Sequence, residues 1–235
     1  MKVFVAGASG AIGLPLCHLL VAAGHQVFAT TRTPAKQEIL RQSGCQSLLL
    51  DCLDEAAVMA AVTDCQPDII IHQLTALPDG LDPAQMDAAR HTNAHLRDVG
   101  TRHLLKAATA VGCTRFIAQS IAFVYADGSP PYTEDAPLRP AGEVTIDGVR
   151  SLESQVANAP MPSVVLRYGK LYGPLTGFDA SPGTGAIHTH AAAHAALLAI
   201  DRGEGIFNIA EDDFPFDCQR ARHQLGFDPA FRLAH

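Results

Sequence analysis

Short apolar runs alternate along this chain with segments in which apolar positions recur at helical spacing. The apolar runs predict strands at residues 2–6, 26–30, 46–50, 68–72, 115–119, 163–167 and 206–209. The helical spacing predicts helices at about residues 14–23, 34–42, 54–62, 83–111, 144–156 and 190–201. Apolar strands that alternate with helices indicate a parallel sheet covered on both faces, and right-handed crossovers make it doubly wound. We therefore expect an α/β, Rossmann-type fold.

Two loops rich in proline, glycine and aspartate follow predicted strands, at residues 126–148 and 172–185. Doubly wound sheets bind ligands at the carboxyl ends of their strands, so we expect the functional site beside these loops. The length of 235 residues fits one domain, with a core at about 1–170 and a smaller C-terminal lobe at about 171–235. The tail of this lobe, residues 220–235, is expected to be polar and mostly helical.

The composition excludes several classes of protein. Apolar residues make up 48% of the chain and charged residues 17%, which is ample for a packed core. No apolar run approaches the roughly 20 residues of a membrane span. The formal charge is −7 and no cluster of lysine or arginine stands out, so we expect neither nucleic acid nor a membrane as partner. Six scattered cysteines and the lack of an export pattern predict reduced thiols in the cytoplasm.

The glycine-rich segment GASGAIG lies between the first predicted strand and the first predicted helix. Gly7 permits a tight turn, Gly10 lets backbone N–H groups approach a pyrophosphate, and Gly13 lets the helix pack closely on the sheet. The positive end of that helix then faces the phosphates. We expect the cofactor-binding loop to comprise Gly7, Ser9, Gly10, Ala11, Ile12 and Gly13. The alternative is a glycine-rich turn that binds nothing.

The end of the second predicted strand indicates which dinucleotide binds. An acidic residue there would bind the ribose 2′-hydroxyl of NAD(H), but this position holds Thr31, followed by Arg32. The Arg32 guanidinium can bind a 2′-phosphate as a charged fork, with the hydroxyl of Thr31 or Thr33 assisting. We therefore expect NADP(H) to be favoured over NAD(H) as the cofactor. The alternative is that Arg32 is an ordinary surface arginine.

These motifs resemble the short-chain dehydrogenase/reductase superfamily, in its extended group of NAD-dependent epimerases and dehydratases. The resemblance extends over nearly the whole chain, through GASGAIG, RFIAQSIAFVYA (115–126), TEDAPLRP (133–140), VVLRYGKLYGP (164–174) and RARHQLGFDP (220–229). It implies that Asp51 and Cys52, in the segment DCLD, hold the adenine. It also implies that HQLTA (72–76), with Gln73, Leu74 and Thr75, lines the nicotinamide side of the site.

The chain departs from this superfamily where the chemistry is usually performed. The superfamily carries a YxxxK pair on the helix after the proline-rich loop, in which the tyrosine is the acid/base and the lysine lowers its pKa. The resemblance puts Thr145 and Val149 at those positions, and no YxxxK occurs in the chain. The usual carbonyl-polarising serine or threonine corresponds to Ile121, with Ser120 one residue earlier and so on the other face of a strand. The chain therefore resembles an atypical branch, with a trimmed C-terminal substrate lobe.

Two residues remain as candidates for catalysis, Ser120 and Tyr168. Tyr168 follows the sixth predicted strand beside the expected nicotinamide, where its phenol can transfer a proton or pack on the cofactor. Ser120 can hydrogen-bond substrate or cofactor. Asn93, in the long predicted helix, lies one turn from the place of a functional asparagine in relatives, and its role stays open.

Three histidines, in an HxHxxxH pattern, raise the question of a metal site. They are His188, His190 and His194, and the last two lie one helical turn apart. No acidic or cysteine ligand lies nearby in the sequence to complete a site. We therefore interpret them as exposed residues at a helix start and expect no metal.

The resulting hypothesis is an atypical short-chain oxidoreductase that uses NADP(H) and acts on a small carbonyl-type molecule, with a proton from Ser120, Tyr168 or water. One alternative is a non-catalytic sensor or scaffold that binds NADP(H), motivated by the missing YxxxK and the short lobe. Another is a nucleotide-sugar epimerase or dehydratase, which the resemblance suggests but the missing tyrosine opposes. The resemblance also implies a homodimer through the long helices near residues 83–111 and 144–156.

Overall fold

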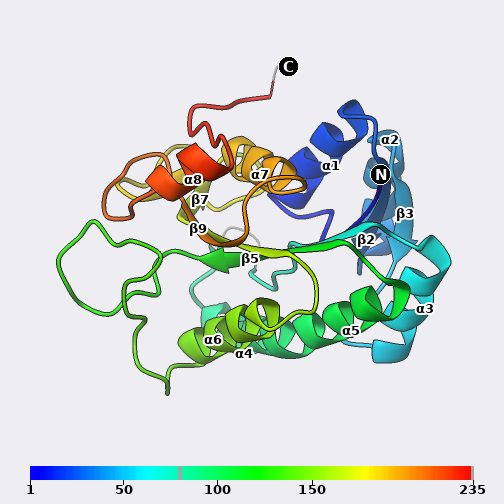
Figure 1. Cartoon of the computed structure of the whole chain (residues 1–235), viewed down its shortest axis with the longest axis horizontal. Coiled ribbons are helices and arrows are strands. Elements are labelled where there is room, and N and C mark those ends of the chain that lie inside the picture. Colours follow the sequence, from blue (N-terminus) through cyan, green and yellow to red (C-terminus); the bar gives the residue numbers. More distant parts are fainter. Residues whose placement is uncertain (79–80, 234–235) are drawn as a thin grey trace.

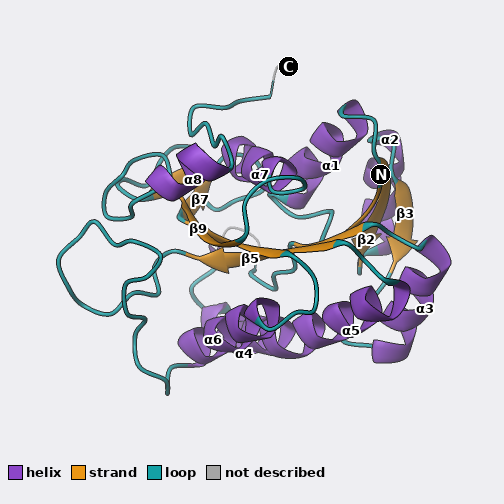
Figure 2. Cartoon of the chain, in the orientation of Figure 1, coloured by secondary structure: helices purple, strands orange, loops and turns teal. Residues whose placement is uncertain are grey.

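A parallel sheet of seven strands forms the middle layer of this computed structural model, and helices cover both of its faces (Figures 1 and 2). The structure describes residues 1–78 and 81–233. The strands of the sheet are, in chain order, β1 (Lys2–Ala6), β2 (Gln26–Thr31), β3 (Gln46–Leu49), β4 (Ile69–His72), β5 (Arg115–Ile121), β6 (Ser163–Tyr168) and β9 (Gly205–Ile209). Their spatial order is β3-β2-β1-β4-β5-β6-β9, and neighbouring strands are parallel. The expected doubly wound fold is confirmed.

The helices form the two outer layers (Figure 2). One layer holds α1 (Gly13–Ala22), α7 (Thr189–Leu198) and α8 (Gln219–Gln224). The opposite layer holds α3 (Glu55–Cys65), α4 (Met86–His95), α5 (Thr101–Val111) and α6 (Val144–Ala157). A short 3₁₀ turn, η1 (Pro34–Lys36), leads into α2 (Gln37–Gln42), which packs at the β3 edge of the sheet. The β1–α1 turn and the loops after β4, β5 and β6 therefore meet at one end of the sheet.

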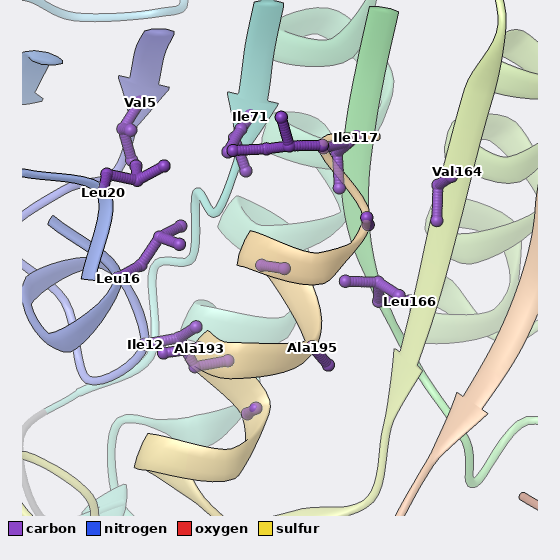
Figure 3. Close-up of a cluster of buried hydrophobic side chains, with 14 of the residues drawn as sticks. Val5, Ile12, Leu16, Leu20, Ile71, Ile117, Val164, Leu166, Ala193 and Ala195 are labelled. Atoms are coloured by element: carbon purple, nitrogen blue, oxygen red, sulfur yellow. The ribbon is translucent and has the colours of Figure 1, made fainter. Parts of the chain in front are cut away.

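Alternation along the strands sends successive side chains into two separate cores. Ile117 of β5 and Leu166 of β6 belong to the core beneath α1 and α7, which Figure 3 shows. Phe116 and Ala118 of β5 belong to the core beneath α3, α5 and α6. This burial on both faces explains why the strand sequences are nearly continuous apolar runs. It also fixes the direction in which each polar side chain near a strand end points.

The structure differs from the sequence-based expectation in three places. The long helix expected at about 83–111 begins at Met86 and contains a π turn, η3 (Leu96–Gly100), between α4 and α5. Two short strands, β7 (Lys170–Tyr172) and β8 (Ala186–His188), pair outside the main sheet. The tail, expected to be mostly helical, has one short helix, α8, among its described residues. The expected boundary near residue 170, between a core and a C-terminal lobe, stays a prediction. The strand β9, which follows it in the chain, belongs to the main sheet.

Within the described ranges, no helix has the length and apolar character needed to cross a membrane.

Candidate functional site

Two of the three glycines in the β1–α1 turn are required by the packing of the chain itself. Gly7 has a φ of +85°, and a Cβ there would lie 2.5 Å from the Gln73 carbonyl oxygen. A Cβ on Gly13 would lie 2.3 Å from the Gly7 carbonyl oxygen. Both distances are far below van der Waals contact. These glycines let the turn pass close to the segment after β4 and let α1 begin directly on the turn.

Gly10 is different, because no described residue crowds the space of its missing side chain. A Cβ on Gly10 would meet only the Gly7 carbonyl oxygen, at 3.5 Å, which is ordinary contact. The adjoining α1 has no side-chain cap and no acidic residue in its first turn. Its N–H groups and dipole therefore favour an anion. An open cradle in front of an uncapped helix fits the pyrophosphate of a dinucleotide.

The end of β2 lies against this turn, as the sequence indicated. The Thr31 hydroxyl is buried, 2.9 Å from the Ser9 hydroxyl, and accepts a hydrogen bond from the Thr33 N–H. Thr31 therefore holds the turn in place. The Arg32 side chain is exposed, and no described residue forms a hydrogen bond or an ion pair with it. Its guanidinium is available to a ligand beside the phosphate turn.

The two residues expected to hold the adenine, Asp51 and Cys52, differ in their exposure. Asp51 is exposed, and its carboxylate accepts a hydrogen bond from the Leu53 N–H. The Cys52 thiol is 1% exposed and faces the core, where burial raises its pKa to about 12. The Cys52 carbonyl accepts a hydrogen bond from His103 Nδ1 at 3.0 Å. Of the two residues, Asp51 is the one with groups free to meet an adenine.

The segment after β4 forms one wall of the site. The Gln73 N–H donates to the Ala6 carbonyl, which places Gln73 beside the phosphate turn. Gln73 Nε2 donates to the Tyr168 hydroxyl at 3.3 Å, while its buried Oε1 has no partner among the described residues. The Leu74 carbonyl accepts from Gln119 Nε2 at 2.6 Å, and Thr75 is exposed. Because the Gln73 Oε1 acceptor has no hydrogen-bond donor among the described residues, a bound ligand could supply that donor here.

The structure gives Ser120 a partner inside the protein. Its hydroxyl donates to the Glu153 carboxylate at 2.7 Å and is 3% exposed. The same carboxylate accepts two hydrogen bonds from Arg167, at 2.9 and 2.7 Å. Ser120 therefore faces α6, on the side of the sheet away from Ile117. The expected separation of Ser120 from Ile121 onto opposite faces is not seen, because Ile121, the last residue of β5, also packs against α6. Its catalytic role stays a prediction, and this geometry does not support it.

Tyr168 lies on the opposite face of the sheet from Ser120. It is the last residue of β6 rather than a residue after it, and its side chain lies in the core beneath α1 and α7. It is 1% exposed, and burial raises the pKa of its phenol well above the ordinary value. The Gln73 side chain is its hydrogen-bond partner. The two catalytic candidates are thus not brought together, and Tyr168 as proton donor also stays a prediction.

An apolar cluster occupies the place that the resemblance assigned to acid–base chemistry. Ile121 packs against Val149 and Ile146 of α6 and against Val124, while Thr145 is half-buried nearby in sequence. By the resemblance, Ile121, Thr145 and Val149 stand where the superfamily carries its serine, tyrosine and lysine. The apolar side chains of Ile121 and Val149 can neither donate a proton to a substrate nor accept one. Hydrophobic packing between β5 and α6 therefore takes the place of the serine and the lysine that the resemblance would lead one to expect.

The three histidines of the HxHxxxH pattern have protein partners. His188 caps α7 by accepting the His190 N–H at its Nδ1, and burial lowers its pKa to about 4. His190 Nδ1 accepts the Leu233 N–H, and the His194 ring stacks on Phe231 with centroids 3.9 Å apart. They hold the start of α7 and the C-terminal tail together. Among residues 1–78 and 81–233, no group of three histidine, cysteine or acidic side chains has metal-binding geometry.

Sequence reasoning missed one residue near the site, Arg97 in the π turn η3. Its side chain is 5% exposed, although arginine is almost never fully buried without a partner. Asn93, whose role was open, lies one turn earlier and accepts the Ala76 N–H at its Oδ1. Asn93 therefore braces the segment after β4. The only signal in the sequence was an arginine within a helix, which gives no indication of burial.

Fold and site together define a dinucleotide-binding protein of the Rossmann type. The profile of the family described as "NAD dependent epimerase/dehydratase family" matches residues 3–209. The chain belongs to this family, whose members are NAD(P)-dependent, so the expected resemblance is confirmed.

Individual relatives point in more than one direction. A 3-diazoavenalumate denitrifying reductase from a Streptomyces species is 42% identical over 190 residues, which are 78% of this chain and 60% of the relative. Methionine adenosyltransferase 2 subunit beta of Xenopus laevis is 33% identical over 123 residues, 51% of this chain and 35% of that protein. The chain thus spans less than two thirds of the length of these relatives.

Solved structures show the same fold. A UDP-glucose 4-epimerase of Thermotoga maritima, crystallised with UDP-glucose, superposes with a TM-score of 0.80 at 18% identity, over 99% of this chain and 94% of that chain. A UDP-glucuronic acid 4-epimerase of Bacillus cereus superposes with a TM-score of 0.78 at 19% identity, over 99% and 95%. At this level of identity the likeness concerns the fold alone.

Proposed function

We propose that this chain is an NADP(H)-dependent reductase of a small electrophilic substrate. The observation that carries the proposal is the open cradle at Gly10, in front of the uncapped start of α1. Gly7, Ser9 and Gly13 shape this cradle, and the backbone N–H groups near Ala11 and Ile12 would face the phosphates of a bound dinucleotide. Asp51 would meet the adenine, and Gln73 the nicotinamide end. The 42% identity to a protein named as a reductase supports the same class of activity.

The choice of NADP(H) rests on the end of β2. The position at which a carboxylate could bind the ribose 2′-hydroxyl of NAD(H) holds Thr31 instead. The Thr31 hydroxyl already contacts the Ser9 hydroxyl and the Thr33 N–H. Arg32 is exposed next to it and has no carboxylate partner among the described residues. A guanidinium forks well onto a phosphate. These contacts favour a 2′-phosphate at this position.

Calorimetric titration with NADPH and with NADH, side by side, tests this proposal. We expect NADPH to bind more tightly, and Arg32→Ser to weaken NADPH by about 10- to 100-fold, since hydrogen bonds to charged groups have this strength. NADH affinity should be unchanged. Arg41→Ser is the matched control, since Arg41 is exposed on α2 and pairs with Glu38 instead. A preference for NADH would overturn the assignment of Arg32, and binding of neither would remove both the reductase and the sensor.

The apolar cluster at Ile121 and Val149 restricts the substrate class. When bound, the reduced nicotinamide supplies a hydride. A carbonyl that receives a hydride also needs a proton, whereas an aryl diazo carbon that receives one releases dinitrogen and needs none. The side chains of Ile121 and Val149 carry no proton donor, which favours an acceptor of the second kind. The Streptomyces relative is named for a diazo substrate, which supports this class.

A second candidate is a non-catalytic protein that senses or presents bound NADP(H). The same apolar cluster supports it, as does the likeness to a protein named as the beta subunit of an adenosyltransferase. Consumption of NADPH with 3-diazo-4-hydroxybenzoate, followed at 340 nm, separates the two. A nucleotide-sugar epimerase is less well supported, because epimerisation at the sugar requires proton-transfer groups that this cluster lacks.

The remaining expectations complete the proposal. A formal charge of −7 supports a small molecule rather than nucleic acid as ligand, and six free, buried cysteines support the cytoplasm as location.

A homodimer would bury the faces of α5 and α6 that carry a shallow, mostly apolar groove along Leu105, Ala110 and Pro160.

A further inference from the structure

Arg97 is a buried cation that has no counter-ion among residues 1–78 and 81–233. It lies in the π turn η3, is 5% exposed, and forms no hydrogen bond or ion pair with any described residue. The polar atoms that are fully enclosed without a partner include Gln73 Oε1 but no atom of Arg97. The guanidinium therefore reaches a surface that a ligand can approach. Single π turns within helices occur frequently at functional sites.

The neighbours of Arg97 along the helix show where it lies. Asn93, four residues before it, binds the Ala76 N–H at 3.2 Å. Thr101, four residues after it, lies 3.1 Å from Nε2 of His72, the last residue of β4. Side chains at this spacing share one face of a helix. Arg97 therefore lies between two residues that both hold the segment 72–76, at the carboxyl end of β4.

The groups around Arg97 that the structure describes do not compensate its charge. Glu153 is the acidic residue whose charge acts on Arg97, but its carboxylate is already bound by Arg167 and Ser120. His72 is neutral, since its Nδ1 accepts the Leu74 N–H and its pKa is lowered to about 4 by burial and by Arg97. Burial lowers the pKa of Arg97 to about 10, which leaves it charged at neutral pH. A buried charge without a partner is strongly unfavourable.

We propose that Arg97 binds a carboxylate of the substrate at the carboxyl ends of β4 and β5. The other anion of the site, the dinucleotide pyrophosphate, would lie at the start of α1, whose layer covers the opposite face of the sheet (Figure 1). The planar guanidinium matches a carboxylate in a bidentate arrangement. This inference rests on the proposed function and adds to it that the small electrophile is an acid.

The test uses aryl carboxylates and their neutral amides as probes. Benzoate and cinnamate, with benzamide and cinnamamide, are titrated calorimetrically into the full chain, both with and without saturating NADP⁺. We expect wild type to bind the carboxylates about 10- to 100-fold more tightly than the amides. Arg97→Met should remove this preference and Arg97→Lys should retain part of it. Arg102→Met is the matched control, an exposed arginine on α5 that lies near Asp98.

Thermal unfolding of the same proteins gives a second readout. Without ligand, Arg97→Met should unfold at a higher temperature than wild type, because it removes an uncompensated charge. Cinnamate should raise the midpoints of wild type and Arg102→Met but not that of Arg97→Met. A lower midpoint for Arg97→Met would make Arg97 a structural residue and overturn the proposal. Equal binding of acids and amides by wild type, or no binding of any acid, would also overturn it. Failure of NADPH to bind is measured separately and counts against the proposed function.

Discussion

Gly7, Gly10 and Gly13 look equivalent in the sequence, but their surroundings give them different tasks. Gly13→Ala would force a Cβ to within 2.3 Å of the Gly7 carbonyl oxygen, whereas the Cβ of Gly10→Ala would meet the same oxygen at 3.5 Å, an ordinary contact. We expect Gly13→Ala to lower the free energy of unfolding by about 1–3 kcal/mol or more, because backbone must move. Gly10→Ala should leave stability near wild type and weaken NADPH binding by about tenfold or more, a loss of ~1.4 kcal/mol.

Urea unfolding and NADPH titration of the two variants separate these tasks, and each variant is the control for the other. The assignment of the cradle fails if Gly10→Ala binds NADPH as tightly as wild type. It also fails if Gly10→Ala unfolds as easily as Gly13→Ala, because the glycine would then serve the fold alone.

At the scale of elements, strand alternation decides what the two catalytic candidates can do. Ser120 of β5 faces α6 and Tyr168 of β6 faces α1 and α7. Ser120→Ala removes one donor from the buried Glu153 carboxylate, so we expect about 1–3 kcal/mol less stability and unchanged turnover. Tyr168→Phe should also leave turnover of 3-diazo-4-hydroxybenzoate intact, since the loss of dinitrogen requires no proton. A large loss of turnover in Tyr168→Phe, with NADPH affinity retained, would instead make Tyr168 the proton donor and favour a carbonyl substrate.

The elements also show what local sequence can and cannot predict. The strands of the main sheet were predictable from their apolar runs, which in the inner strands reflect burial on both faces. The edge strand β3 is only partly buried. The offset of Ser120 relative to Ile121 was misleading, because β5 ends at Ile121 and both side chains contact α6. The π turn η3 and the β7–β8 pair were not predictable, since tertiary contacts rather than residue pattern produce them. The burial of Arg97 could not be predicted for the same reason. Whether a charged side chain has a partner is known only once elements distant in the sequence are packed together.

At the scale of the whole molecule, one fully buried histidine and three partly buried ones have lowered pKa values. Burial lowers the pKa of His72 from 6.5 to about 4 and that of His188 to about 4, and it also lowers the pKa values of His25 and His194. Below the ordinary histidine pKa, the unfolded chain therefore binds protons that the folded chain refuses. Stability is fully present above about pH 6.5 and is lost as the pH falls towards 4.

His72 should account for a large share of this acid sensitivity. It is fully buried, both ring nitrogens are engaged, and Arg97 lies nearby, so its lowered pKa corresponds to about 3 kcal/mol between pH 6.5 and 4. Urea unfolding at several pH values should show wild type losing stability over this range. His72→Gln should lose less, while His91→Gln, at an exposed position on α4, should follow wild type. If wild-type stability is flat from pH 7 to 4.5, or if His72→Gln keeps the full slope, then His72 is not a buried neutral group and the uncompensated charge beside it needs another explanation.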